Sequence, residues 1–547
     1  MTTLQPINLV DFTGGLNLRR SDFNLAQNES PSMRNVEVDP RRGFSSRRGW
    51  ARWNAADIVS PAVDWEPRNG YVHSLSDDSY VVYMANGGNL YAAGVNGVFS
   101  DLSITVTASP HLVDIASWGD VAYIACGAGQ VSYKRDGVGT AVAVPDVVGN
   151  FNDDYTTPVG GFMPTAEHIE AHSGYVFVAH VEDNPDPSNP TTSAPQPNRL
   201  RWSHPDEPED WATNDFLDIK TGGGRITALK SFQDHLLIFK TESVWALYGY
   251  DLDSWQLIQV SRSAGTPSPA AVTASESTLF FYSPVGRSGI FAYQGGQQVT
   301  HISEKLRTAM DEIENTDDVW LGWVGRRLWC SLPWRPTGQE NDQSSAFVFD
   351  PEVGSGAWVR HEAALGHIKC ILDRSDTESE FPLAAICGCS GAAAMVRLEF
   401  QDRAEDRILE DGTSTAFDAE YRTGWIDADF PDRLKSWRRP RFILRDPDFD
   451  VVIKIEAFAN YSVEIPTRTS TLTLNAGGNA ADWDDGWLWD DGTLWATPST
   501  GSRLERTAPF GHSRALQLQF SVTPATLGAA WGVDAIILKF VYRRFTT

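Results

Sequence analysis

Short hydrophobic segments with alternating polar positions recur through the middle of the chain, and polar turns separate them. Each copy holds runs of four to eight residues rich in Val, Ile, Tyr, Phe and Trp, bounded by Asp, Asn, Ser or Gly. Such runs are typical of antiparallel hairpins. The copies begin at Tyr71, His111, His168, Ile226, Ala271, Asp318 and His367.

The spacing of these copies predicts a β-propeller over residues 61-400. Copies begin about every 40 to 60 residues, the range expected of four-stranded blades when loop lengths vary. We expect six or seven blades. A Pro-, Ser- and Asn-rich segment, Glu182 to Asn198, interrupts one copy, and its composition predicts an exposed loop without a strand. A flexible loop and a binding finger are the two alternatives for it.

Longer strand-like segments follow residue 400, where the blade pattern ends. In one of them Val451, Ile453 and Ile455 alternate with Val452, Lys454 and Glu456, which predicts a sheet with one buried face. We therefore expect a β-sandwich or platform domain over 401-547. Residues 1-60 show no strong strand pattern, and we expect an extended amino-terminal arm there. The predicted fold class is all-β.

Size and charge narrow the functional classes. The chain has 547 residues, a net charge of -26 and a pI near 4.8. Stable gripping of duplex DNA depends on Lys and Arg displacing counterions from phosphates, so this composition argues against it. An acidic wall is compatible with DNA sliding through a channel, which we hold as a hypothesis about transit.

The sequence shows no pattern of a secretory leader or a membrane-spanning helix, and few cysteines. The first residues lack a basic and apolar leader, and no segment is apolar for the ~20 residues that a spanning helix needs. We therefore expect no stable membrane insertion. Cysteines are sparse and scattered, so we expect buried free thiols and synthesis in a reducing cytosol. They are Cys126, Cys330, Cys370, Cys387 and Cys389.

Motifs for catalysis or metal binding are weak. The sequence has no G-x-S-x-G, H-E-x-x-H or P-loop pattern. Cys387 and Cys389 lack a second ligand pair, and the segment from Asp446 to Asp450 has Val451 where a calcium loop needs Gly. We therefore expect no catalytic residues, no cofactor and no metal, and predict that the chain is not an enzyme.

A tryptophan-rich segment from Asp482 to Ala496 contains W-D-D-G twice. It loosely resembles the Asp-box turn of sialidase-type propellers, which is structural in those enzymes. Trp is common at the energetic centres of interfaces because it buries a large rigid area. The segment is thus a candidate interface or gate loop, and a hairpin packed within its own subunit is the alternative. Its candidate residues are Trp483, Trp487, Trp489 and Trp495.

Arginine clusters stand out in this acidic chain. One contains Arg438, Arg439 and Arg441, and the other contains Arg41, Arg42, Arg47 and Arg48. Because Arg binds carboxylates through paired hydrogen bonds, both clusters are candidates for contacts between subunits. Solvated surface is the default interpretation for both.

Several stretches resemble the tail nozzle proteins of short-tailed bacteriophages, also called tail tubular protein B or tail hub. They are INLVDFTGGLN (7–17), LAQNESPSMRNVEVD (25–39), SSRRGW (45–50), the long segment 199–249, SAGTPSPAAV from Ser263, GRSGIFAYQGG from Gly286 and the closing WGVDAIILKFVYRRF (531–545). Together they extend over most of the chain. None of these motifs is diagnostic alone.

The resemblance implies a virion structural protein that forms a ring, a homo-oligomer of six subunits, in the phage tail after synthesis in the host cytoplasm. Its expected partners are a tail adaptor or portal-proximal tail protein and the tail fibres, with genomic DNA passing through without sequence-specific binding. The alternative is a propeller tail protein that binds or cleaves host glycans. A cleaving enzyme would need two or three acids and an Arg cluster converging where the blades meet.

Overall fold

The computed structural model describes the chain in many segments with gaps between them. These are residues 5–39, 41, 43–54, 67–86, 88–106, 113–146, 151, 160–183, 194–334, 345–353, 356–363, 367–372, 383–389, 392–401, 404–408, 412–445, 447, 450–475, 502–522 and 529–542. Strands dominate these segments, and their single α-helix is α1 (Arg307–Asp311). The predicted all-β class is confirmed.

Seven four-stranded sheets correspond to the seven predicted copies. Six are built from consecutive strands, and the last takes its fourth strand from near the amino terminus. The first sheet contains β8 (Pro67–Ser74), β9 (Tyr80–Asn86), β10 (Asn89–Ala93) and β11 (Phe99–Thr105), and the second contains β12 (Asp114–Trp118), β13 (Val121–Ala125), β14 (Ser132–Asp136) and β15 (Val142–Val144). The third sheet contains β16 (Ala166–His172), β17 (Tyr175–Asp183), β18 (Ala194–His204) and β19 (Glu207–Asp218). The fourth sheet contains β20 (Ile226–Phe232), β21 (His235–Lys240), β22 (Val244–Tyr248) and β23 (Gln256–Ser261).

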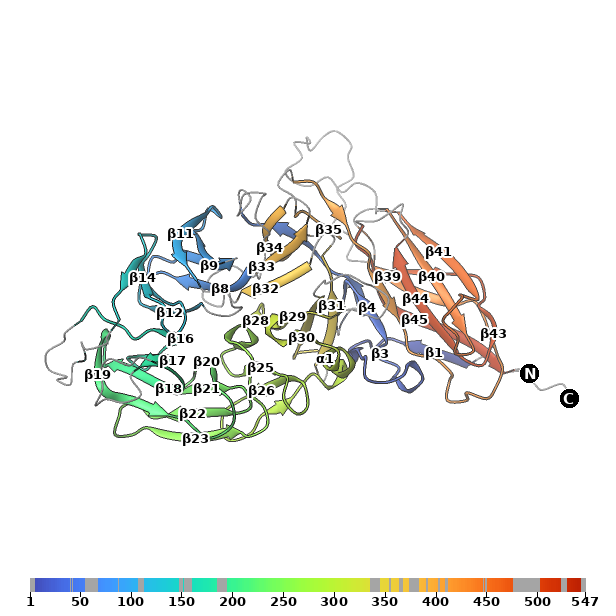
Figure 1. Cartoon of the computed structure of the whole chain (residues 1–547). Coiled ribbons are helices and arrows are strands. Elements are labelled where there is room, and N and C mark those ends of the chain that lie inside the picture. Colours follow the sequence, from blue (N-terminus) through green and yellow to red (C-terminus); the bar gives the residue numbers. More distant parts are fainter. Residues whose placement is uncertain are drawn as a thin grey trace. The chain divides into compact units, whose positions relative to one another are not determined.

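The last three sheets are β24 (Val272–Ala274), β25 (Leu279–Ser283), β26 (Gly289–Tyr293) and β27 (Thr300–His301); β28 (Trp320–Val324), β29 (Arg327–Leu332), β30 (Ser345–Asp350) and β31 (Ala357–His361); and β32 (His367–Leu372), β33 (Leu383–Cys389), β34 (Ala392–Gln401) and β7 (Gly49–Arg52). Strands β8, β12, β16, β20, β28 and β32 surround the centre (Figure 1). The predicted propeller is confirmed, with seven blades.

Side chains of β9 show how the blades pack. Every residue of this strand is buried, because it has a neighbouring blade on each side. Val82 and Met84 pack with Leu372 of β32, whereas Val81 and Tyr83 pack with Ile115 of β12 and its neighbours. Successive side chains of a strand point to opposite faces, so a strand between two blades is hydrophobic at every position.

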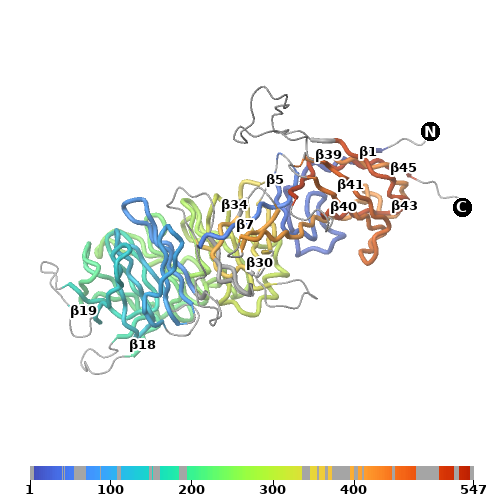
Figure 2. Tube along the Cα trace, turned by 90° about the horizontal axis from the view of Figure 1, so that it is seen from above, coloured from blue at the N-terminus to red at the C-terminus, as the bar shows by residue number. Residues whose placement is uncertain are grey.

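Two further sheets form a sandwich. The larger contains β42 (Ser502–Arg506), β39 (Arg441–Arg445), β45 (Gly532–Tyr542), β38 (Lys435–Trp437), β43 (Gly511–Ser513), β1 (Gln5–Leu9), β5 (Val36–Asp39) and β6 (Gly43–Ser46). The smaller contains β4 (Ser32–Arg34), β37 (Glu420–Arg422), β44 (Leu516–Val522), β40 (Val451–Ala459) and β41 (Arg468–Leu474). Figure 2 shows strands of both sheets gathered in one body.

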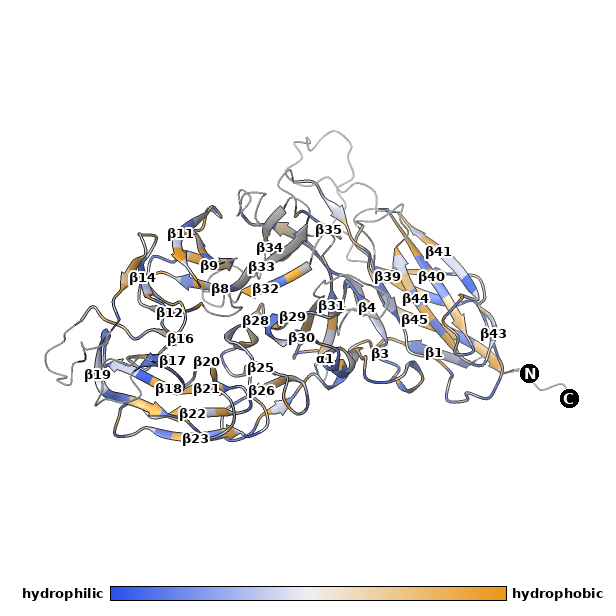
Figure 3. Cartoon of the chain, in the orientation of Figure 1, coloured by the Kyte–Doolittle hydropathy of each residue, from blue (hydrophilic) through white to orange (hydrophobic). Residues whose placement is uncertain are grey.

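The sandwich core is aromatic. Phe44 of the larger sheet stacks on Tyr421 of the smaller sheet with ring centroids 3.9 Å apart, and Phe442 meets Phe520 across the same interface at 5.7 Å. Along β40 the buried residues are Val451, Ile453 and Ile455, as their alternation predicted. Figure 3 shows hydrophobic and hydrophilic residues alternating along these strands. The predicted sandwich is confirmed.

The chain divides into two compact units that are discontinuous in sequence. One comprises 1–51, 345–365 and 398–547, and the other comprises 52–344 and 366–397. These limits differ from the expected division at residues 60 and 400. Sequence patterns did not reveal the difference because 345–365 resembles the strand segments before it.

The amino-terminal segment is not the strandless arm that we expected. It contributes β1, which pairs with β45, and β4, which pairs with β37. It also contributes β6, which pairs with β45, and the two-residue strands β2 (Gly15–Leu16) and β3 (Glu29–Ser30). These strands have two to five residues, and most are completed by partners hundreds of residues away. A local pattern is too short to reveal such strands.

The Pro-rich segment was predicted to be a loop without a strand, but both of its ends lie in strands. Glu182 pairs with Pro195, and Asp183 pairs with Ala194, so the ends extend β17 and β18 as a hairpin. Residues 184–193 lie outside the described part of the chain. Cys126, Cys330 and Cys370 are buried thiols, as expected, whereas the side chains of Cys387 and Cys389 are outside the description. Among the described residues, no helix has the length and apolarity needed to cross a membrane.

Candidate functional sites

A cavity of about 200 Å³ lies where the inner strands of the blades meet. Duplex DNA is far too wide for such a space. Its lining includes Tyr71, Asp114, Glu170, Lys230, Thr273 and Trp320, which come from six different blades.

Polar groups around this cavity bind the next blade. Asp114 Oδ2 accepts a hydrogen bond from the Ile169 amide at 3.3 Å, and Glu170 Oε1 accepts one from the Ser231 amide at 3.0 Å. Thr273 Oγ1 accepts one from the backbone of the following blade at 3.1 Å. Because backbone groups in this region have little access to water, these side chains satisfy them and tie neighbouring blades together.

Histidine–serine pairs join two of the blade junctions. His73 Nδ1 lies 2.7 Å from Ser117 Oγ, and His172 Nδ1 lies 2.8 Å from Ser231 Oγ. A Ser–His pair can also serve nucleophilic catalysis, but the other nitrogen of His73 lies 3.0 Å from the Asp120 carbonyl, and the ring is fully buried. This arrangement accounts for His73 as a structural residue.

The cavity also holds acid–base groups. Burial raises the pKa of the Glu170 carboxyl, against the opposing effects of Lys230 and the Ser231 amide. Sequence patterns did not reveal Asp114, Glu170 and Lys230 as neighbours because each belongs to a different blade. Two acids therefore converge at the blade centre, whereas no Arg is among the described residues that line the cavity.

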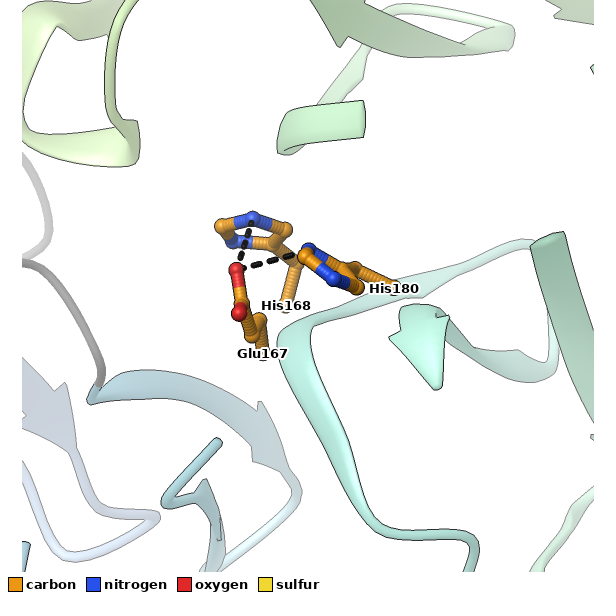
Figure 4. Close-up of side chains that lie close together, drawn as sticks. All are labelled: Glu167, His168 and His180. Atoms are coloured by element: carbon orange, nitrogen blue, oxygen red, sulfur yellow. Dashed lines mark ion pairs between the residues drawn. The ribbon is translucent and has the colours of Figure 1, made fainter. Parts of the chain in front are cut away.

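A second cluster lies in the third blade, at the start of β16 and at a bulge in β17. It contains Glu167, His168 and His180, whose ligand-type atoms all lie within 4.8 Å of one another. Figure 4 shows one oxygen of the Glu167 carboxylate facing both imidazole rings. Burial would raise the pKa of Glu167, but the contact with His180 and the charges of His180, His168 and Arg225 lower it. We expected no set of metal ligands from the sequence. The sequence analysis missed this cluster because the spacing of Glu167, His168 and His180 along the chain matches no metal-binding motif.

Buried ion pairs hold the base of the β17–β18 hairpin. Asp183 Oδ2 lies 3.0 Å from Arg199 Nη1 and 2.6 Å from Arg201 Nη2. Arg199 also binds Asp218, with Nε at 2.8 Å from Oδ1, and lies over the ring of Phe216. Every charge in this network faces an opposite one, which is the condition for burying ions. The network fixes both strands where they leave the blade.

The proposed contact residues are only partly described. Trp483, Trp487, Trp489 and Trp495 lie outside the described residues. Arg438 and Arg439 are exposed after β38, and Arg441 is half-buried at the start of β39. Nothing in these positions tests the interface or gate prediction.

For Arg47, the predicted contact with a neighbouring subunit is wrong. It binds Asp406 of the same chain, and both side chains are completely buried, so Arg47 is not available to a neighbouring subunit. Its partner lies 359 positions away, so no local pattern around Arg47 could reveal the pair.

No protein-family model matches the chain, and no curated protein matches it. Among solved structures, a streptogramin B lyase is 11% identical with a TM-score of 0.38, and the match covers 62% of this chain and 95% of that one. Virginiamycin B lyase from Staphylococcus aureus is 11% identical with a TM-score of 0.37, and the match covers 62% of this chain and 96% of that one. YCF48 bound to D1 peptide is 9% identical with a TM-score of 0.35, and the match covers 64% of this chain and 97% of that one. Likenesses of this size carry no argument about activity or partners.

Proposed function

We propose that this chain is a structural protein of the virion, the subunit of a ring-shaped tail nozzle through which a short-tailed bacteriophage releases its DNA. The observation that carries the proposal is the resemblance of stretches from both ends of the chain to that family. Ile7 of the first stretch pairs with Leu538 of the last, and Ser45 of a third stretch pairs with Gly532. Glu37 of the stretch 25–39 pairs with Ser45 in turn, so four of the resembling stretches build one sheet.

The proposal places the DNA path between subunits. The propeller cavity of about 200 Å³ is too small for a duplex, so the channel must be the lumen of a ring. A net charge of -26 suits such a lumen, since a wall that repels phosphate does not retain the DNA. The subunit number of six, the adaptor and fibre partners and the tail location are parts of this proposal.

Antibody labelling of phage particles that encode this chain tests the proposal. Gold-labelled antibody should mark the tail below the head in negative-stain images. Particles made without the protein should lack the distal tail and should regain it when the chain is supplied in trans. Absence of the chain from purified particles would overturn the proposal.

One observation favours the glycan alternative, and it is the convergence of Asp114 and Glu170 in the central cavity. A buried Glu with a raised pKa is suited to act as a general acid. Incubation of host polysaccharide with the wild-type protein and with Glu170→Gln discriminates the two functions. The nozzle proposal predicts no shortened chains with either protein, whereas an enzyme would shorten them only when Glu170 is intact.

A further inference from the structure

Two histidines and one glutamate converge between neighbouring inner strands of the third blade. Glu167 and His168 are adjacent near the start of β16, and His180 lies on β17. His180 Nδ1 lies 2.7 Å from Glu167 Oε2, and His168 Nε2 lies 3.9 Å from the same oxygen. All three ligand atoms can therefore face one point (Figure 4).

We propose that Glu167, His168 and His180 bind one divalent transition-metal ion, with zinc as the preferred ion. Zinc binds imidazole nitrogen at about 2.0–2.1 Å and carboxylate oxygen at about 2.0–2.2 Å, which places tetrahedral ligands roughly 3.3 Å apart. The two distances above bracket that separation. Two imidazoles with one carboxylate favour zinc and similar ions over calcium and magnesium, which prefer oxygen ligands.

His168 supplies an independent reason. The residue is 3% exposed, and neither of its ring nitrogens forms a hydrogen bond with the described residues. Buried polar groups are nearly always satisfied, so an imidazole in this state needs a partner. A metal at Nε2 would provide one.

Asp114 stands on the other side of the same ring. Its Oδ2 lies 3.6 Å from His168 Nδ1. Metal-binding histidines usually donate their second N–H to a carboxylate, which fixes the ring orientation and strengthens the metal bond. Asp114 would therefore be a positioning residue for His168.

The backbone of β17 turns His180 toward the cluster. The pairing register with β18 shifts between Ala179 and Val181, and His180 itself has φ +53°. Bulges of this kind re-aim a side chain, and a non-glycine residue in the left-handed region is costly without compensation. Metal binding would supply that compensation.

Arg225 limits the affinity of the site. Its Nη1 lies 2.9 Å from Glu167 Oε2, and its side chain is half exposed. A guanidinium beside the carboxylate competes with a cation for it. Because Arg225 reaches solvent, it can move aside when the metal enters, and removing its charge should strengthen binding.

Zinc titration of the purified full-length chain, stripped with a chelator and freed of any His tag, tests the site. We expect one zinc per chain, and a loss of affinity of at least about 100-fold in His168→Ala/His180→Ala and in Glu167→Gln. His172→Gln is the matched control, because His172 is a buried histidine of the same strand that bonds to Ser231. It should bind zinc as the wild type does.

Two more variants keep the test decisive if the double variant misfolds. Asp114→Asn should weaken zinc about tenfold, and Arg225→Gln should bind zinc more tightly than the wild type. Circular dichroism of the zinc-free proteins checks their folding. A wild type that binds no zinc, an Arg225→Gln protein with unimproved affinity, or a folded double variant that binds as tightly as the wild type would overturn the proposal. This site does not depend on the nozzle function.

Discussion

Arg47 and Asp406 form a two-point ion pair in which neither side chain is exposed to solvent. Nη1 donates to Oδ1 at 2.9 Å, and Nη2 donates to Oδ2 at 2.8 Å. Asp406 Oδ1 also accepts a hydrogen bond from the Trp50 amide, and the Arg47 guanidinium lies 3.7 Å from the centroid of the Phe417 ring. This pair fixes the amino-terminal segment to a part of the chain that follows the last blade.

Removing one member of this pair should be costly, because it leaves a buried charge without its partner. We expect Asp406→Asn to lower the free energy of unfolding by about 3–5 kcal/mol, measured by urea denaturation. The exposed pair Arg34–Asp418, at 3.4 Å, is the control, and Asp418→Asn should cost less than about 1 kcal/mol. Equal effects of the two changes would contradict the account of the buried pair.

Steric contacts explain why the first resembling stretch has a glycine at position 15. Gly15 has φ +63°, and a Cβ atom there would lie 2.7 Å from the Trp358 carbonyl oxygen. We expect Gly15→Ala to destabilise the chain by on the order of 3 kcal/mol. Gly119 has φ +57° with no atom near its Cβ position, so Gly119→Ala should cost only about 1–2 kcal/mol. Thermal unfolding of both variants checks the difference, and similar losses would argue against the contact.

The propeller should lose stability in mild acid through His172. Burial, with the charge of His235, lowers the pKa of His172 from 6.5 to about 4, against the charge of Asp234. Below pH 6.5 the unfolded chain takes up a proton that the folded chain refuses until about pH 4, so stability falls as the pH drops through this window. The loss is at most about 3 kcal/mol. Urea unfolding at several pH values should show a smaller loss for His172→Gln, and an identical slope would refute the assignment.

Arg438 and Arg439 provide a test of assembly apart from folding. Both side chains are exposed, so reversing their charge should change the free energy of unfolding by no more than about 0.5 kcal/mol. If they contact carboxylates of a neighbouring subunit, Arg438→Glu/Arg439→Glu should prevent ring formation in native mass spectrometry. Rings that form as readily as in the wild type would remove these residues from the interface.

Local pattern predicted the repeating elements but not the contacts that join distant segments. Strand β40 shows its buried face in its own alternation, and each blade copy carries its hairpins within one window, so both were predictable. Strand β1 was not, because five residues show too little periodicity and the partner β45 lies at the other end of the chain. Glu167, His168 and His180 were missed for a similar reason, since a bulge at His180 joins residues whose spacing matches no motif.

In the proposed function, this chain assembles into a ring around a channel for DNA. The most direct measurement is the oligomeric mass and negative-stain image of the purified protein, alone and mixed with a candidate tail adaptor protein. The account predicts a ring of about six subunits with a central hole wide enough for duplex DNA. A protein that stays monomeric even with the adaptor would contradict it.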